Sequence, residues 1–246
     1  MQPFRRLALI VLVLAAPQAH TESPETLLRD ATLFGRFSTL TASVQMEIHD
    51  RGTRQRTLAV HVDQSDPDYR KTLVHVTAPA FLSRLKFLSH ATPRAVDRWI
   101  STSSGVRRVA DSSRDEPVFD SDFTVEDFAP DHSGEYTVRH AGTRMVGSEL
   151  CDVIEVSPSG PSDGHAMRRV FVSRGDRLLV RAEYYAEDGG LVRVMELQRR
   201  LTVDGRSFPG TIVMTTPARR SHTVLTVRTV EVDVPIPSRV FSRGAL

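Results

Sequence analysis

Cysteine and lysine are scarce in this chain of 246 residues, which contains one cysteine and only two lysines among its 32 basic residues. A single cysteine excludes an intramolecular disulfide bond, so the fold must depend on a hydrophobic core, and the chain is long enough to bury one. Cys151 stands among apolar neighbours (Leu150, Val153 and Ile154). This setting is typical of an inert buried thiol rather than of a nucleophile.

Several motifs that mark enzymes are also missing. The chain contains neither an H-E-x-x-H zinc motif nor a phosphate-binding P-loop. Among its nine histidines, His61 shares a strand face with Asp63 and His132 follows Asp131 in a loop, but neither pair forms a three-ligand metal set in the sequence. We therefore predict a protein that is not an enzyme and has no catalytic residues, metal or cofactor. A hydrolase remains the catalytic alternative.

The charges give no sign of a partner nucleic acid. The 32 basic and 30 acidic residues alternate along the chain, with no block of five or more basic residues. Without Arg5 and Arg6 the two counts are equal at 30. We predict that the protein binds no nucleic acid.

One long apolar run, Leu7–Ala16, follows Arg5 and Arg6 at the N-terminus and leads to small residues at Pro17–Ala19. This layout predicts a secretory signal peptide over residues 1–19, with cleavage after Ala19. Ten residues at 1.5 Å each are too few to cross roughly 30 Å of hydrocarbon, although an uncleaved anchor is the alternative. No cysteine near this site could carry a lipid, so we predict an exported protein that is not itself lipidated.

The next segment predicts a helix over residues 24–36. Ser23 can cap it, Pro24 suits its first position, and an apolar stripe follows at helical spacing, formed by Leu27, Leu28, Ala31 and Phe34.

From residue 39 the apolar period changes to two, which indicates strands. Leu40, Ala42, Val44, Met46 and Ile48 alternate with polar residues before a turn at Asp50–Gly52. A second alternation predicts that Leu178, Val180, Ala182 and Tyr184 share a face. We expect about ten to thirteen strands and no βαβ unit.

These strands predict a mainly β fold, consisting of one large curved antiparallel sheet or unclosed β-barrel over residues 20–246. A wide flat sheet would expose its apolar face, so the helix over residues 24–36 is expected to lie across the concave side as a lid.

Four segments between residues 87 and 128, together with a closing segment, form a recognisable set of motifs. They are Phe87-Leu88-Ser89, Asp97-Arg98-Trp99-Ile100, Arg107-Arg108-Val109, Ser121–Phe128 and the closing Ile236–Phe241. This set resembles the outer-membrane lipoprotein-sorting protein-like family, the relatives of the periplasmic lipoprotein carrier LolA. The chain departs from the family pattern at Ile100–Ser103, where a tyrosine and proline are usual, and at Asp120, where glycine is common.

The resemblance implies an unclosed antiparallel barrel with a helical lid. It also implies a carrier or chaperone in the periplasm that binds lipoprotein acyl chains or lipids, beside an inner-membrane lipid transporter of the RND type. We expect a monomer. The alternative function is a ligand-sensing or accessory domain for a membrane transporter or signalling partner.

Two sets of residues are candidates for the site. Large aromatic and flexible apolar side chains suit an acyl cavity, and they suit an ordinary core equally well. The candidate lining residues are Leu28, Phe34, Met46, Phe87, Trp99, Phe123 and Met195. Charged side chains of the long loop could latch it over the cavity, or could form structural ion pairs only. These residues are Arg107, Arg108, Asp120, Asp122 and Asp127, with at most one arginine expected to pair inward with one of the three aspartates.

Overall fold

The computed structural model describes residues 22–34, 37–65, 70–92, 95–129, 136–158 and 166–246. The predicted signal peptide and the Asp131-His132 pair lie outside these residues.

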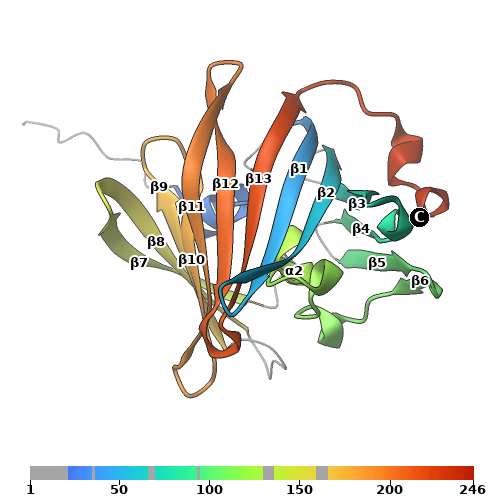
Figure 1. Ribbon diagram of the computed structural model, residues 1–246. Coiled ribbons are helices and arrows are strands. Elements are labelled where there is room, and N and C mark those ends of the chain that lie inside the picture. Colours follow the sequence, from blue (N-terminus) through green and yellow to red (C-terminus); the bar gives the residue numbers. More distant parts are fainter. Residues whose placement is uncertain (1–21, 35–36, 66–69, 93–94, 130–135, 159–165) are drawn as a thin grey trace, which may run out of the picture.

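The described chain forms one antiparallel sheet of thirteen strands, in the order β6-β5-β4-β3-β2-β1-β13-β12-β11-β10-β9-β8-β7. The sheet curves strongly, and β6 and β7 at its two ends are not paired with each other, so it is not closed into a barrel (Figure 1). This confirms the predicted mainly β, unclosed architecture. The strands are β1 (Thr39–Asp50), β2 (Thr53–Ser65), β3 (Lys71–Ala78), β4 (Lys86–Ala91), β5 (Val96–Thr102), β6 (Gly105–Arg108), β7 (Tyr136–Val146), β8 (Glu149–Pro158), β9 (Met167–Ser173), β10 (Leu179–Tyr185), β11 (Leu191–Val203), β12 (Arg206–Thr216) and β13 (Ser221–Val232).

Tight two-residue turns join several neighbouring strands. Arg51 and Gly52 between β1 and β2 have φ values of 48° and 80°, and Asp204 and Gly205 between β11 and β12 have 48° and 75°. Two successive positive φ values match the right-handed twist of a hairpin, which explains a glycine at the second position of both turns.

The alternation predicted for β1 is confirmed, because all five of its apolar residues from Leu40 to Ile48 are buried on the concave side. The alternation predicted for residues 178–184 is wrong at Val180. A register shift between Leu179 and Arg181 marks a β-bulge, and Val180 packs with Phe171 in a cluster on the opposite face. The extra residue of a bulge reverses the side-chain alternation locally.

The helices are short. They are α1 (Pro24–Asp30), α2 (Val125–Phe128) and the 3₁₀ turns η1 (Ala80–Leu82), η2 (Asp111–Ser113), η3 (Val118–Asp120), η4 (Pro217–Arg219), η5 (Ser238–Phe241) and η6 (Arg243–Ala245).

Helix α1 begins as predicted, with Pro24 in its first turn and the Ser23 hydroxyl accepting a hydrogen bond from the Thr26 amide at 3.2 Å. It ends at Asp30, six residues before the predicted end, so Phe34 lies beyond it. Its apolar side chains pack at the end of the sheet formed by β7 to β10, and a lid across the concave side is therefore not confirmed. This cluster contains Leu27, Leu28, Ala31, Ile154, Val156, Val170 and Val172.

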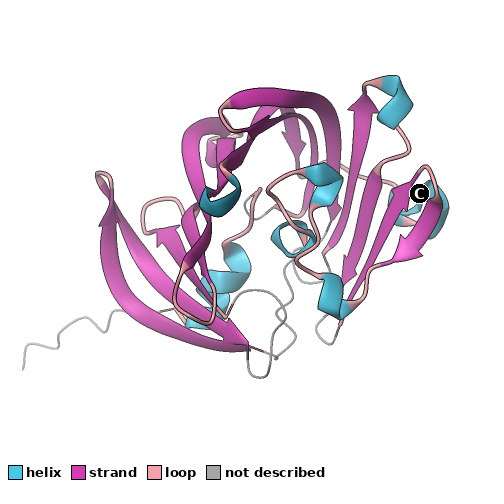
Figure 2. Cartoon of the chain, turned by 60° about the horizontal axis from the view of Figure 1, so that its bottom comes forward, coloured by secondary structure: helices cyan, strands magenta, loops and turns pink. Residues whose placement is uncertain are grey.

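Residues 109–129, named here the inner segment, fill much of the concave side. The sheet arches over these residues, which include α2 (Figure 2). Their apolar side chains join the main core, and they are Val109, Val118, Phe119, Phe123, Val125, Phe128 and Ala129.

Candidate functional site

The structure brings most of the candidate lining residues together inside the curved sheet. Phe34, Met46, Phe87, Phe123 and Met195 belong to the main core, and each is at most 2% exposed. Leu28 is a residue of α1 and lies in the adjoining cluster between this helix and the sheet.

Trp99 does not belong to this interior. It packs with Leu88 and Phe241 in a separate cluster on the outer face. The inward positions of β5 are Val96, Arg98 and Ile100, and successive strand residues point to opposite faces. The assignment of Trp99 to the apolar cavity is therefore wrong.

The two loop arginines pair with other carboxylates than those predicted. Arg107 pairs with Glu116, and the Nε of Arg108 donates to Asp97 at 3.1 Å. Asp120 pairs with Arg56 at 3.3 Å. The inner segment turns away from β6 and carries the other two aspartates toward β10–β13, out of reach of Arg107 and Arg108. These exposed pairs contribute little stability each.

Asp127 is the centre of a buried polar cluster at the start of α2. Its carboxylate accepts hydrogen bonds from the Tyr184 hydroxyl at 2.6 Å, the Arg193 Nη1 at 2.7 Å, and the Thr124 amide and hydroxyl at 2.8 and 3.0 Å. Burial alone would raise the pKa of Asp127, but the Arg193 charge and these hydrogen bonds hold it below its ordinary value. The carboxylate is therefore ionised and fully paired.

Two further polar anchors hold the inner segment. Arg98 on β5 lies 3.4 Å from the Glu126 carboxylate and donates to the Ala129 carbonyl at 2.9 Å, with both charged side chains 1% exposed. The Asp122 carboxylate accepts hydrogen bonds from the hydroxyls of Ser221 and Thr223 on β13. Ionic and hydroxyl contacts thus tie this segment to both halves of the sheet.

Sequence reasoning missed Arg98, Tyr184, Glu126 and Arg193 as members of the site. One signal was available for Arg98, because an arginine stands at an apolar position of the β5 alternation, where a buried charge requires a partner.

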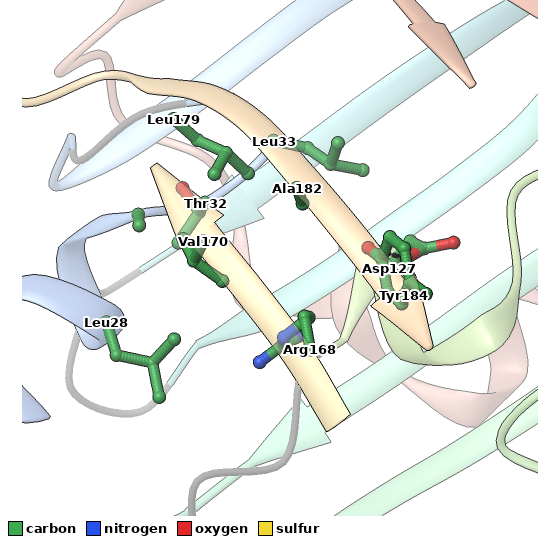
Figure 3. A pocket seen from close by; sticks show the side chains of 10 residues that line it. Leu28, Thr32, Leu33, Asp127, Arg168, Val170, Leu179, Ala182 and Tyr184 are labelled. Atoms are coloured by element: carbon green, nitrogen blue, oxygen red, sulfur yellow. Dashed lines mark hydrogen bonds between the residues drawn. The ribbon is translucent and has the colours of Figure 1, made fainter. Parts of the chain in front are cut away.

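A small cavity of about 30 Å³ lies between α1 and strands β9 and β10 (Figure 3). The side chain of Arg168 lines it, and no described residue forms a hydrogen bond with its Nε. A more polar cleft of about 220 Å³ opens where the inner segment meets β11 and η4, beside Asp122 and Arg193. Ligand sites for small molecules commonly measure roughly 300–1,000 Å³, so either space would have to enlarge to hold an acyl chain.

Comparisons with known proteins agree with this architecture. A family model described as "uncharacterized protein" matches residues 68–246. The chain belongs to this family. A search of curated protein sequences found no match.

Solved structures of similar fold cover nearly the whole chain. A DUF1329 family protein from Desulfovibrio piger is 22% identical, with 91% of this chain and 97% of that chain covered and a TM-score of 0.78. An outer membrane lipoprotein-sorting protein domain from Vibrio parahaemolyticus is 17% identical over 89% of this chain and 93% of that one, with a TM-score of 0.78. A LolA superfamily protein from Nitrosomonas europaea is 15% identical over 91% and 97%, with a TM-score of 0.68. These likenesses confirm the LolA-like fold expected from residues 87–128.

Three features of this LolA-like chain bear on other functions. Within the described residues, no three His, Cys, Asp or Glu side chains are grouped as metal ligands, and no helix is long and apolar enough to cross a membrane. Gly160-Pro161-Ser162-Asp163-Gly164 has the G-x-S-x-G spacing of a nucleophile elbow, but it lies outside the described residues. It connects the neighbouring antiparallel strands β8 and β9, whereas an elbow joins a strand to a helix.

Proposed function

We propose that the protein is a periplasmic carrier or chaperone that binds the acyl chains of lipoproteins or similar hydrophobic ligands inside its curved sheet. Residues 1–19 are its export signal, and residues 20–246 are a single carrier domain. The observation that supports this function most directly is the filling of the concave face. An apolar interior is covered by a segment of short helices and loops with polar anchors, rather than by a second sheet.

Burial of acyl chains supplies the binding energy in this proposal. Each buried CH₂ group contributes about 0.8 kcal/mol, so even part of a chain would bind measurably. The inner segment or α1 moves to admit the ligand, and the space that opens is lined by Phe34, Met46, Phe87, Phe123 and Met195.

Fluorescence quenching by a brominated fatty acid tests both uptake and location. Trp99 is the only tryptophan and lies on the outer face, so a ligand held inside should leave its emission unchanged. In the variant Trp99→Phe/Phe123→Trp, the new indole lies inside, and the same ligand should quench it in a saturable manner. Trp99→Phe alone, which has no indole, supplies the background.

Native mass spectrometry of protein purified from the periplasm should also detect bound lipid or lipoprotein. Absence of lipid in the purified protein, together with no quenching of the indole introduced at position 123 at any ligand concentration, would rule out the carrier function.

One feature favours the alternative of an accessory domain for a membrane transporter. Strand β7 is a sheet edge of eleven residues, and an unpaired edge can accept a strand from a partner. Crosslinking in cells distinguishes the two functions, because an accessory domain stays with one membrane partner and a carrier exchanges among many clients.

A further inference from the structure

Arg168 is a buried arginine for which the described residues supply no partner. It lies on the concave face of β9, between Val156 on β8 and Tyr184 on β10, and is 7% exposed. Within the described part of the chain, its guanidinium makes no hydrogen bond or ion pair. Isolated buried charges are costly, and proteins normally pair them.

Two described carboxylates of the inner segment have other partners than Arg168. Asp127 also borders the cavity, but Arg193, Tyr184 and Thr124 occupy it with four hydrogen bonds. Glu126 pairs with Arg98, which lies 3.4 Å away. Among the described residues, no carboxylate is therefore left to neutralise the positive charge of Arg168.

The surroundings of Arg168 are mostly apolar. Its nitrogen atoms point toward Leu28 in Figure 3, away from Asp127 and Tyr184. The cavity of about 30 Å³ has the volume of about one water molecule, which is space for a small polar group and not for a hydrocarbon chain. Its apolar lining consists of Leu28, Ala31, Leu33, Val170, Leu179 and Ala182.

We propose that Arg168 binds the anionic head group of an amphiphile, a carboxylate or a phosphate, whose chain lies between α1 and strands β8 and β9. A guanidinium presents parallel N–H donors that match either oxyanion. The chain would replace Leu27 and Leu28 on the apolar surface of the two strands. Helix α1 has only seven residues, and a helix this short depends on such packing to persist. This inference rests on the proposed carrier function and narrows its ligand to acidic amphiphiles.

Competition binding with matched ligands tests the role of the charge. Hexadecanoate, hexadecanol and inorganic phosphate are each titrated against a fluorescent fatty-acid probe. We expect wild type to bind hexadecanoate about 10- to 100-fold more tightly than hexadecanol, because a hydrogen bond to a charged group contributes a difference in affinity of about this size. Arg168→Met should lose this preference and still bind hexadecanol, while Arg168→Lys should keep part of it.

Thermal unfolding of the free protein separates a binding role from a structural one. Arg168→Met removes an unpaired buried charge, so its Tm should stay the same or rise. Arg169→Met is the matched control, because Arg169 points to the opposite face and pairs with Glu155 and Glu183. This control should lower Tm and retain the preference for hexadecanoate.

Each other outcome overturns the inference in a recognisable way. Equal affinity of wild type for hexadecanoate and hexadecanol would refute the head-group site and leave the carrier function standing. Phosphate that competes as strongly as hexadecanoate would show a site for free anions instead. A Tm of Arg168→Met that falls as far as that of Arg169→Met would make Arg168 structural. Failure of both amphiphiles to bind would reject the carrier function itself.

Discussion

Asp127→Asn should strongly destabilise the attachment of the inner segment. The substitution keeps the shape of the side chain but leaves the Arg193 charge, 8% exposed, without its counter-ion. Removing one partner of a buried ion pair costs about 3–5 kcal/mol. Arg193 keeps a hydrogen bond to the Asp122 carbonyl at 3.1 Å and its position over the Tyr184 ring, with 4.3 Å between the guanidinium carbon and the ring centroid. We therefore expect the free energy of unfolding to fall by about 3 kcal/mol, the lower end of that range.

The double variant Asp127→Asn/Arg193→Met provides the control. It removes both charges and should be more stable than Asp127→Asn alone, because no unpaired charge remains buried. Urea unfolding followed by circular dichroism measures both values. Hydrogen exchange should show that the amides of residues 118–129 open first in the single variant.

The same substitution predicts a change in acid stability. The pKa of Asp127 is depressed in the folded protein, so its stabilising contribution is complete above the ordinary value of 3.8 and is lost as the pH falls through the folded pKa. The difference in unfolding free energy between wild type and Asp127→Asn should therefore be constant near neutral pH and shrink below about pH 4. A single variant within about 1 kcal/mol of wild type, with an unchanged pH profile, would refute the reasoning.

Three further predictions follow from the packing. Leu28→Ala should lower the free energy of unfolding by about 2–5 kcal/mol if α1 stays docked until the whole protein unfolds. In hydrogen exchange of the wild type, the amides of α1 should exchange before those of β1 and β2, and equally slow exchange would make α1 part of the permanent core. Burial raises the pKa of the Cys151 thiol to about 11, so an alkylating reagent at pH 8 should modify it only after unfolding, and rapid modification of the native protein would contradict its buried position. Phe241→Ala should change the emission of Trp99 without changing ligand affinity, whereas a parallel loss of affinity would connect the outer cluster to the site.

The sequence predicts the sheet well because its inward and outward residues alternate in long runs. In β1 one face is apolar and the other polar without exception between residues 40 and 48. The sequence therefore predicts the strand, the face that it buries and the turn that ends it. The bulge at Val180 was not predictable in this way, because no residue type in this strand marks the position where the extra residue is inserted.

The errors at Trp99 and α1 have different physical origins. Around Trp99, an arginine stands among the apolar residues of one face of β5 and a tryptophan among the polar residues of the other, so both faces contain a residue that contradicts the alternation. The deciding partner of Arg98 is Glu126, which lies 28 residues away in sequence. Helix α1 was expected to continue as far as residue 36, but Asp30 and Thr32 favour the helix weakly. Tertiary contacts of the following residues with the main core then end it.

The polar anchors of the inner segment have a consequence for how the interior could open. Arg98–Glu126 and Arg193–Asp127 are buried pairs, and such pairs add little net stability compared with apolar side chains of the same volume. They do fix a single arrangement, because any shifted position leaves a charge unpaired in the core. The interior therefore has one well-defined closed state whose polar contacts water or a ligand can replace. If apolar residues stood at these positions, the closed state would be more stable and the interior would be harder to open.

The same logic separates Arg168 from Arg98 and Arg193. All three guanidinium groups are buried on the concave side, but the described chain supplies carboxylate partners for only two of them, which is why the third is assigned to the ligand.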